Sequence, residues 1–323
     1  MEQVKLLEVK SEIAAGTRGA SLGVDALKTA CLDKGSDYFA LYDAEEVENV
    51  NDILFDTNKF PHAKFIDGVL VMEERVCEAT AEALAGKYFP IVLAGDHSTS
   101  AGTICGIKKT YPDKRLGVIW IDAHADLHTP FTTPSGNMHG MPLAMVSAID
   151  NQACQVNQPG VETLMYWEKL KHVGLPGPKI YLSDVVFIAV RDTEEPEKHL
   201  MEQYGIKNFS PAEIREKGVK KVVEETCFLL DHCEMIYVSF DVDSMDSKYS
   251  EGTGTPVADG LTVQEASDFN TLLIKNKKVC VWEMVEVNPT LDTLNSMAET
   301  AFDILEATTQ ALLERDIRLE KAV

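Results

Sequence analysis

A dense group of possible metal ligands follows an uninterrupted apolar run near the middle of the sequence. The run Leu116–Ile121 (LGVIWI) shows no polar alternation, which is typical of a parallel strand buried on both faces. Asp122, His124 and Asp126 come next, and their spacing of two places all three on one side of an extended segment. Carboxylates held this close repel one another unless a cation neutralises them. The pattern therefore favours a metal site over a solvated acidic loop.

Two other strand-like runs end in the same way. The run Phe89–Ala94 (FPIVLA) leads to His97, and Met235–Phe240 (MIYVSF) leads to Asp241 and Asp243. The carboxyl ends of parallel strands meet at one edge of a sheet, where α/β folds build their sites. We therefore expect six side chains to converge there: His97, Asp122, His124, Asp126, Asp241 and Asp243.

The types of these six side chains indicate the chemistry. Two imidazoles and four carboxylates without a thiolate suit manganese or a similar cation better than structural zinc. Four negative charges balance two divalent cations, so the set predicts a binuclear site. Two cations that share a water lower its pKa toward neutrality, and the resulting nucleophile performs hydrolysis. A role as simple turn residues at strand ends would explain any one of the six, but not all together.

The segments between these motifs alternate helix and strand patterns. Apolar residues at intervals of three and four predict a core-facing helix over Val69–Leu84. Further helices are expected at 24–31, 101–109, 141–149, 161–171, 191–204, 219–230 and 294–318, and further strands at 184–190 and 279–284. This order predicts an α/β protein with a parallel sheet. The segment 150–179, which is broken by Pro and Gly pairs, is interpreted as a surface insertion, and 32–67 shows no clear pattern.

Composition excludes several classes of protein. The formal net charge of −22 argues against a nucleic-acid partner, which requires a basic surface. No apolar run approaches the roughly 18 residues that a membrane span needs. The seven cysteines are scattered and form no CxxC pair, and the first residues lack the features of a signal peptide. We therefore expect reduced cysteines and a cytoplasmic location.

Three motifs together resemble a known family. The segments Gly95–Ser98 (GDHS), Asp122–Asp126 (DAHAD) and Ser239–Asp243 (SFDVD), in this order, are similar to the metal-binding motifs of the ureohydrolases, the manganese enzymes that include arginase, agmatinase and formimidoylglutamase. The resemblance implies a three-layer α/β/α fold with a central, mainly parallel sheet in a single domain over 1–323. It also implies two Mn²⁺ per chain, hydrolysis of a guanidino or amidino group, and a homo-oligomer, either a trimer or a hexamer.

Within this family the loop Thr132–Gly140 (TTPSGNMHG) is most similar to that of the arginases. The resemblance implies hydrolysis of L-arginine, a small guanidino amino acid, to L-ornithine and urea. Asp126 would hold the nucleophile as well as a metal, Glu286 would pair with the guanidinium, and His139 would relay a proton to the leaving amine. The implied substrate contacts are His128, Ser135, Asn137, Glu194, Glu197, Thr255 and Glu286. Ser135 and Asn137 offer neutral donors to an α-carboxylate, whereas Glu194 and Glu197 offer negative charge to an α-ammonium.

Two departures from the arginase pattern leave alternatives open. His128 stands where many arginases have asparagine, and Glu194 stands where aspartate is common. Formimidoylglutamase, or another hydrolase of guanidino or amidino acids, is the alternative within the family. A non-catalytic oligomeric protein that keeps the fold is the alternative from another class. The presence of His139 and Glu286 favours an enzyme, because a purely structural metal site needs neither.

Overall fold

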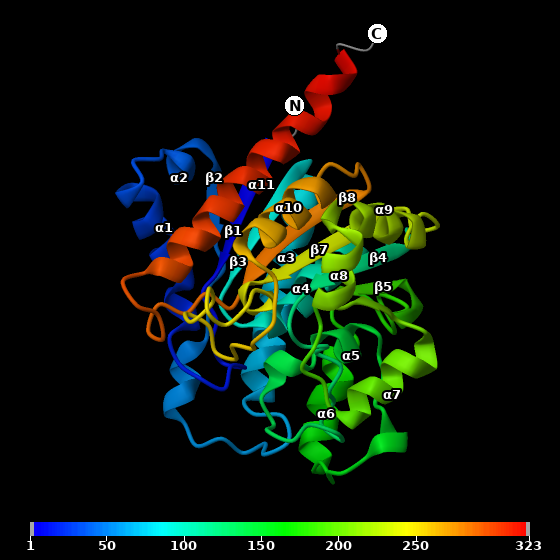
Figure 1. Ribbon diagram of the computed structural model, residues 1–323. Helices are drawn as coiled ribbons and strands as arrows, with labels where there is room; N and C mark the ends of the chain where they lie inside the picture. Colours follow the sequence, from blue (N-terminus) through cyan, green and yellow to red (C-terminus); the bar gives the residue numbers. More distant parts are fainter. Residues whose placement is uncertain (1–2, 321–323) are drawn as a thin grey trace.

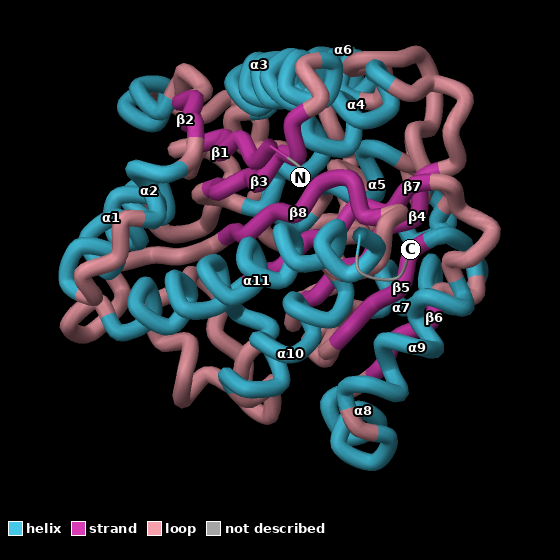
Figure 2. Tube along the Cα trace, turned by 90° about the horizontal axis from the view of Figure 1, so that it is seen from above, coloured by secondary structure: helices cyan, strands magenta, loops and turns pink. Residues whose placement is uncertain are grey.

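A sheet of eight parallel strands forms the centre of the molecule. The computed structural model describes residues 3–320 (Figure 1). Its strands follow the order β2-β1-β3-β8-β7-β4-β5-β6 (Figure 2). The strands are β1 (Gln3–Val9), β2 (Asp43–Glu46), β3 (Tyr88–Ala94), β4 (Leu116–Ile121), β5 (Val185–Ile188), β6 (Lys207–Phe209), β7 (Met235–Asp241) and β8 (Val279–Val285). Every pairing within the sheet is parallel. All strands therefore deliver their carboxyl ends to the same edge.

Helices cover both faces of this sheet (Figure 2). One face carries α3 (Ile66–Ala85), α4 (Ser100–Thr110), α5 (Pro142–Val146) and α6 (Val161–Leu170), and the other carries α1 (Gly23–Asp33), α9 (Val219–Leu229), α10 (Val263–Leu273) and α11 (Ser296–Glu320). The remaining helices are α2 (Tyr38–Leu41), α7 (Glu195–Tyr204) and α8 (Pro211–Lys217). The predicted three-layer α/β/α architecture is confirmed. None of the helices within 3–320 is long and apolar enough to cross a membrane.

The two cores explain why the central strands are apolar throughout. Along β4, Val118 and Trp120 pack into the core on the α3 side, whereas Ile119 and Ile121 pack into the core on the α11 side. Successive side chains of a strand point to opposite faces, so a strand covered on both faces needs apolar residues at every position. The run LGVIWI therefore indicated a strand in the interior of the sheet.

Several segments differ from the sequence-based expectation: β1, β2, β6, α8 and α10 were not predicted, and the segment 150–179 packs differently from what was expected. The structure places β1 within the sheet, where Val9 pairs with Ala94 of β3, although the first 60 residues showed no clear strand. The expected surface insertion at 150–179 contributes α6, which buries Trp167 and Leu170 in the core beside α3. A helix that buries two large apolar side chains is part of the outer layer and not an appendage.

Two carboxylates, one from α3 and one from β8, are buried in the core. Glu73 of α3 is 1% exposed, and neither of its oxygens has a hydrogen-bond partner among the described residues. Glu283 of β8 accepts a hydrogen bond of 2.7 Å from Tyr237. Burial raises the pKa of Glu73 well above its ordinary value, and the nearby charge of Asp96 raises it further. The free energy of unfolding therefore falls as pH rises from the pKa of Glu73 in the unfolded chain to its higher pKa in the folded protein.

We expect Glu73→Gln to stabilise the protein at alkaline pH. The amide keeps the shape of the side chain but cannot ionise, so at about pH 8 the free energy of unfolding should rise by at least about 1.4 kcal/mol, the equivalent of one pKa unit between the folded and unfolded chain. The difference should shrink toward pH 4, where the unfolded glutamate is also protonated. Urea denaturation at both pH values measures this. Glu82→Gln, at an exposed position of the same helix, is the control, and a destabilised Glu73→Gln variant at both pH values would contradict the prediction.

Candidate functional site

The structure brings the six predicted metal ligands together at the carboxyl edge of the sheet. Ligand-type atoms of His97, Asp122 and Asp126 all lie within 4.8 Å of one another, and so do those of Asp122, His124 and Asp243. Asp122 belongs to both groups and offers a different oxygen to each imidazole. Asp122 would therefore contribute a ligand oxygen to each of the two groups.

His97 is at the centre of the first group. Its Nδ1 lies 3.0 Å from Asp122 Oδ2 and 3.2 Å from Asp126 Oδ2 and from Asp241 Oδ2. On the other side of the ring, Nε2 lies 2.7 Å from Ser239 Oγ, and the imidazole stacks on Trp120 at 4.1 Å between ring centres. These contacts fix the ring so that Nδ1 faces the carboxylates. Burial lowers the pKa of His97, but the three carboxylates outweigh it and hold the pKa well above its ordinary value.

The second group is held mainly by the backbone. His124 Nδ1 lies 3.0 Å from Asp243 Oδ2 and 3.4 Å from Asp122 Oδ1. The backbone N–H of His124 donates to Asp122 Oδ1 at 2.6 Å, and that of Ala123 donates to Asp243 Oδ1 at 3.1 Å. Thr255 Oγ1 also donates to Asp243 Oδ2 at 3.1 Å, so this predicted substrate residue contacts a metal ligand directly.

The charges and orphaned atoms of the cluster fit a pair of cations. Burial together with the neighbouring Asp243 and Asp122 raises the pKa of Asp241 well above its ordinary value. His97 Nδ1 and Asp122 Oδ2 are buried without a hydrogen bond among the described residues, although they face each other at 3.0 Å. A bound cation would satisfy these converging atoms in place of a proton on the imidazole. Oxygen and imidazole donors without thiolates match the manganese class of cation.

Two residues of the site have a left-handed backbone conformation. The φ angles are 50° at Asp126 and 67° at Glu286, and non-glycine residues adopt such values at a cost. Glu286 is held by its N–H, which donates to Gly95 O at 2.8 Å. A Cβ at Gly95 would lie 2.0 Å from Ser11 O, so only glycine allows the backbone at position 95 to approach Ser11 this closely. The segments that follow β3 and β8 are thus hydrogen-bonded to each other, both through Gly95 and through the ligand His97.

A cavity of about 290 Å³ lies beside the ligands, a size at the lower end of small-molecule sites. Its lining includes His139 and six predicted substrate residues: His128, Ser135, Asn137, Glu194, Glu197 and Thr255. Glu286 lies behind this lining, with Oε1 3.2 Å from His139 Nδ1 and 3.0 Å from the His97 N–H that donates to it. The ligands and the predicted catalytic residues thus surround one cavity.

The acidic side of the cavity is organised by α7. His128 Nε2 pairs with Glu194 Oε2 and lies 3.6 Å from Glu197 Oε2. Both oxygens of Glu197 accept backbone hydrogen bonds, from Leu127 at 3.2 Å and from Glu194 at 3.1 Å. Glu197 therefore shapes the cavity wall. Sequence reasoning did not single out Asp192, which lines the same side. Its position just after a strand, two residues before Glu194, was the signal that could have found it.

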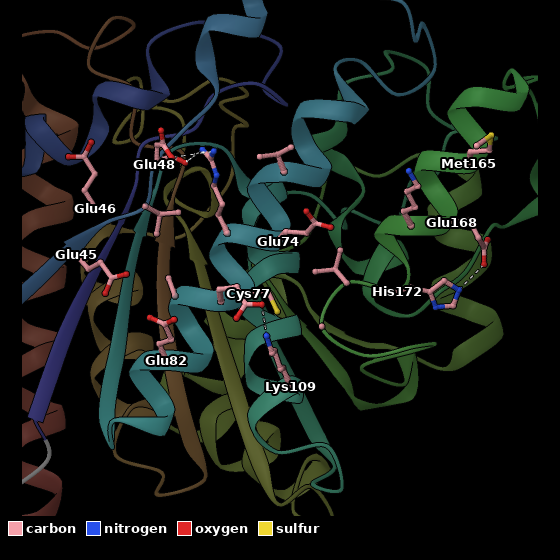
Figure 3. Close-up of a pocket in the computed structure, with 18 residues that line it drawn as sticks. Glu45, Glu46, Glu48, Glu74, Cys77, Glu82, Lys109, Met165, Glu168 and His172 are labelled. Atoms are coloured by element: carbon pink, nitrogen blue, oxygen red, sulfur yellow. Dashed lines mark hydrogen bonds and ion pairs between the residues drawn. The ribbon is translucent and has the colours of Figure 1, made fainter.

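A larger hollow lies elsewhere on the described structure. A groove of about 1140 Å³ runs along the outer side of α3 toward α6 (Figure 3). Several of its carboxylates already have cationic partners: Glu78 pairs with Lys109, and Glu48 lies 3.3 Å from Arg75. Since none of the six predicted ligands lines this groove, the smaller cavity is the candidate site.

Comparisons with known proteins agree with this geometry. The model of the Arginase family matches residues 2–310. The arginase of Bacillus subtilis (strain 168) is 33% identical over 308 residues, which cover 94% of this chain and 96% of the relative, and that of Bacillus caldovelox is 32% identical over 94% and 97%. The crystal structure of arginase from Bacillus subtilis superposes with a TM-score of 0.79 at 31% identity, over 95% of this chain and 98% of that one. With the ligand cluster and its cavity in place, these similarities show that the chain belongs to the arginase family.

Proposed function

We propose that this protein is an arginase that hydrolyses the guanidino group of L-arginine to L-ornithine and urea, with two Mn²⁺ per chain. The observation that carries the proposal is one small cavity that combines a ligand cluster for two cations, the His139–Glu286 pair, and a lining with both neutral donors and acidic groups. His97, Asp122, His124, Asp126, Asp241 and Asp243 would hold the cations. When bound, the cations supply a nucleophilic hydroxide from water near neutral pH.

Glu286 would orient the substrate. Burial raises the pKa of Glu286, but the hydrogen bond and positive charge of His139 outweigh it, so the pKa lies below its ordinary value. The group is therefore a buried carboxylate that keeps its charge. A guanidinium is a flat cation with several donors and no acceptor, and a carboxylate pairs with it in a defined plane. Paired with Glu286, the guanidinium carbon would face the ligand cluster.

His139 would supply the proton for the leaving amine. Burial lowers its pKa, but Glu286 outweighs burial and raises the pKa above the ordinary value. The imidazole side chain is 19% exposed, so it can exchange protons with solvent while it lines the cavity. A protonated imidazole at this place can transfer its proton to the departing nitrogen as the carbon–nitrogen bond breaks.

The mouth of the cavity would bind the amino-acid end. Asn137 and Ser135 provide donors for a carboxylate, and Glu194, together with Asp192, provides negative charge for an ammonium. Glu194 is already paired with His128, and an incoming ammonium would share that carboxylate. The two sides match the opposite charges of an α-amino acid.

A urea assay tests the proposed function. Purified protein loaded with Mn²⁺ should release urea from L-arginine much faster than from agmatine, and it should release neither ammonia nor formamide from formiminoglutamate. Release of formamide would assign the chain to the formimidoylglutamases, and turnover of none of the three substrates would favour a non-catalytic protein. We further propose a cytoplasmic trimer or hexamer. The seven cysteines, all without a disulfide, support a reducing compartment, and light scattering during gel filtration measures the subunit number.

We expect His139→Ala to act on turnover and not on binding. Loss of a general acid should lower kcat by about 10²–10⁴, while KM for arginine should change little. Added imidazole should restore part of the activity, because its protonated form can occupy the space left by the side chain and donate a proton. Steady-state kinetics measure both parameters. A rise in KM with unchanged kcat would reassign His139 to substrate binding.

A further inference from the structure

A segment outside the cavity holds the loop that forms its mouth. Lys64 precedes α3, and its backbone N–H donates to Gly136 O at 2.7 Å. Its side-chain Nζ donates to Asn137 Oδ1 at 2.9 Å. Gly136 has a φ of 76°, and a Cβ there would lie 2.0 Å from Pro61 O. The segment 61–64 and the loop 135–137 are thus in close contact through both backbone and side chain.

This contact determines which end of the Asn137 amide is free. The ammonium group of Lys64 can donate hydrogen bonds but cannot accept them, so the atom of Asn137 that faces it must be the amide oxygen. The amide nitrogen is then left as a donor, and it makes no hydrogen bond to any residue that the structure describes. Gly16 leaves room for it, since a Cβ at Gly16 would lie 2.7 Å from Asn137 Nδ2. Because Asn137 lines the cavity, its free end is available to a ligand.

The charge of Lys64 matters because the cavity is strongly acidic. No lysine or arginine lines the cavity within the described residues. Six carboxylates do: Asp126, Asp192, Glu194, Glu197, Asp241 and Asp243. Bound cations would balance Asp126, Asp241 and Asp243, but Asp192, Glu194 and Glu197 would still repel a ligand with a carboxylate. A cation on the far side of Asn137 polarises the amide so that its N–H groups become better donors to an anion. Lys64 thus brings positive charge next to Asn137, one of the neutral donors that line the cavity.

We propose that Lys64 is a positioning residue that makes this site select guanidino compounds carrying a carboxylate. It acts through Asn137, by fixing the orientation of the amide and strengthening its N–H donors, and it does not touch the substrate itself. This inference rests on the proposed function, because it names the substrate feature that the same cavity recognises. It predicts that the carboxylate of the ligand, and not its guanidinium, is sensitive to Lys64.

Substitution of Lys64 tests the inference. In the Mn²⁺-loaded enzyme, Lys64→Met should raise KM for L-arginine and Ki for L-ornithine by about tenfold, the effect of losing one charge-assisted hydrogen bond. The kcat value and the Ki of putrescine, which is ornithine without its carboxylate, should stay within twofold. Lys59→Met removes the same charge from an exposed position five residues earlier and should change none of these values. Lys64→Arg should restore most of the affinity for ornithine.

A double substitution separates an action through Asn137 from a general effect. If Lys64 acts through Asn137, Lys64→Met should add little to Asn137→Ala, so the Ki of ornithine in the double variant should equal that in Asn137→Ala alone. Additive effects, an equal loss of putrescine binding, or an unchanged Ki of ornithine would overturn the inference. Should Lys64→Met fold poorly, Lys64→Gln gives the same comparison. A wild-type enzyme that does not hydrolyse arginine would instead refute the proposed function.

Discussion

Asp122→Asn is expected to remove at least one of the two metal ions per chain and nearly all turnover. Asp122 is shared by both ligand groups, since Oδ2 faces His97 and Oδ1 faces His124. Asparagine keeps the shape but loses the charge and one of the two ligating oxygens. Removal of a group that only supports a ligand costs 10–100-fold in metal affinity or activity, so loss of a shared ligand should lower kcat by more than about 100-fold. Elemental analysis of the desalted protein, together with a urea assay, measures both effects.

Asp192→Asn is the matched control for this prediction. The Asp192 carboxylate lies 3.8 Å from His124 Nε2, on the same side of the cavity, but it belongs to neither ligand group. We therefore expect Asp192→Asn to keep two ions per chain, whatever its effect on substrate affinity. An Asp122→Asn protein that retains two ions and near-normal kcat would show that the cluster is not the catalytic metal centre.

Glu286→Gln is expected to abolish most activity while leaving the metals in place. The guanidinium would lose its anionic partner in a buried site, a change that costs about 2–5 kcal/mol, or roughly 30-fold to several thousand-fold in kcat/KM. Since Glu286 belongs to neither ligand group, the metal content should remain at two ions per chain. The pKa of His139 should fall, because the carboxylate that raises it against burial is gone. NMR titration of the His139 ring in the metal-free protein follows this shift.

Glu251→Gln is the corresponding control, because it removes the same charge at an exposed position. Its kcat/KM and the His139 titration should match those of the wild type. A Glu286→Gln enzyme that loses its metals would place Glu286 in the ligand shell. If the kcat/KM of Glu286→Gln remained near that of the wild type, another group would have to pair with the guanidinium.

The metal cluster could be predicted from sequence because its information is local. Each of the three motifs follows directly on an apolar strand, and in a parallel sheet this alone brings His97, Asp122 and Asp241 to the same edge. Contacts between distant segments are not indicated by any local sequence pattern. The bond from Thr255 to Asp243 and that from Lys64 to Asn137 depend on how loops fold back, which spacing in the sequence does not reveal.

The missed elements have physical explanations. Strand β1 contains Lys5 and Glu8, which suggest a solvated segment, but Lys5 pairs with Glu45 at 2.5 Å and Glu8 with Lys28 at 2.6 Å. Ion pairs with neighbouring elements thus allow charged residues in a strand that lies inside the sheet. Helix α10 did have a local signal. Thr262 and Glu265 form a capping box at its start, and a T-x-x-E pattern before apolar residues predicts such a helix start.

The position of β8 has a consequence for the way the protein is made. This strand is the last in the chain, but it lies between β3 and β7, so the two halves of the sheet pair only through it. His97 follows β3 on one half, whereas Asp122 and Asp241 belong to the other. During synthesis His97 can join Asp122 and Asp241 only after β8 has been made and has inserted between β3 and β7. Pairing of strands that are far apart in sequence is slow. A chain that lacked the residues from 279 onward would therefore expose the edges of β3 and β7 to aggregation, and added metal would not restore it.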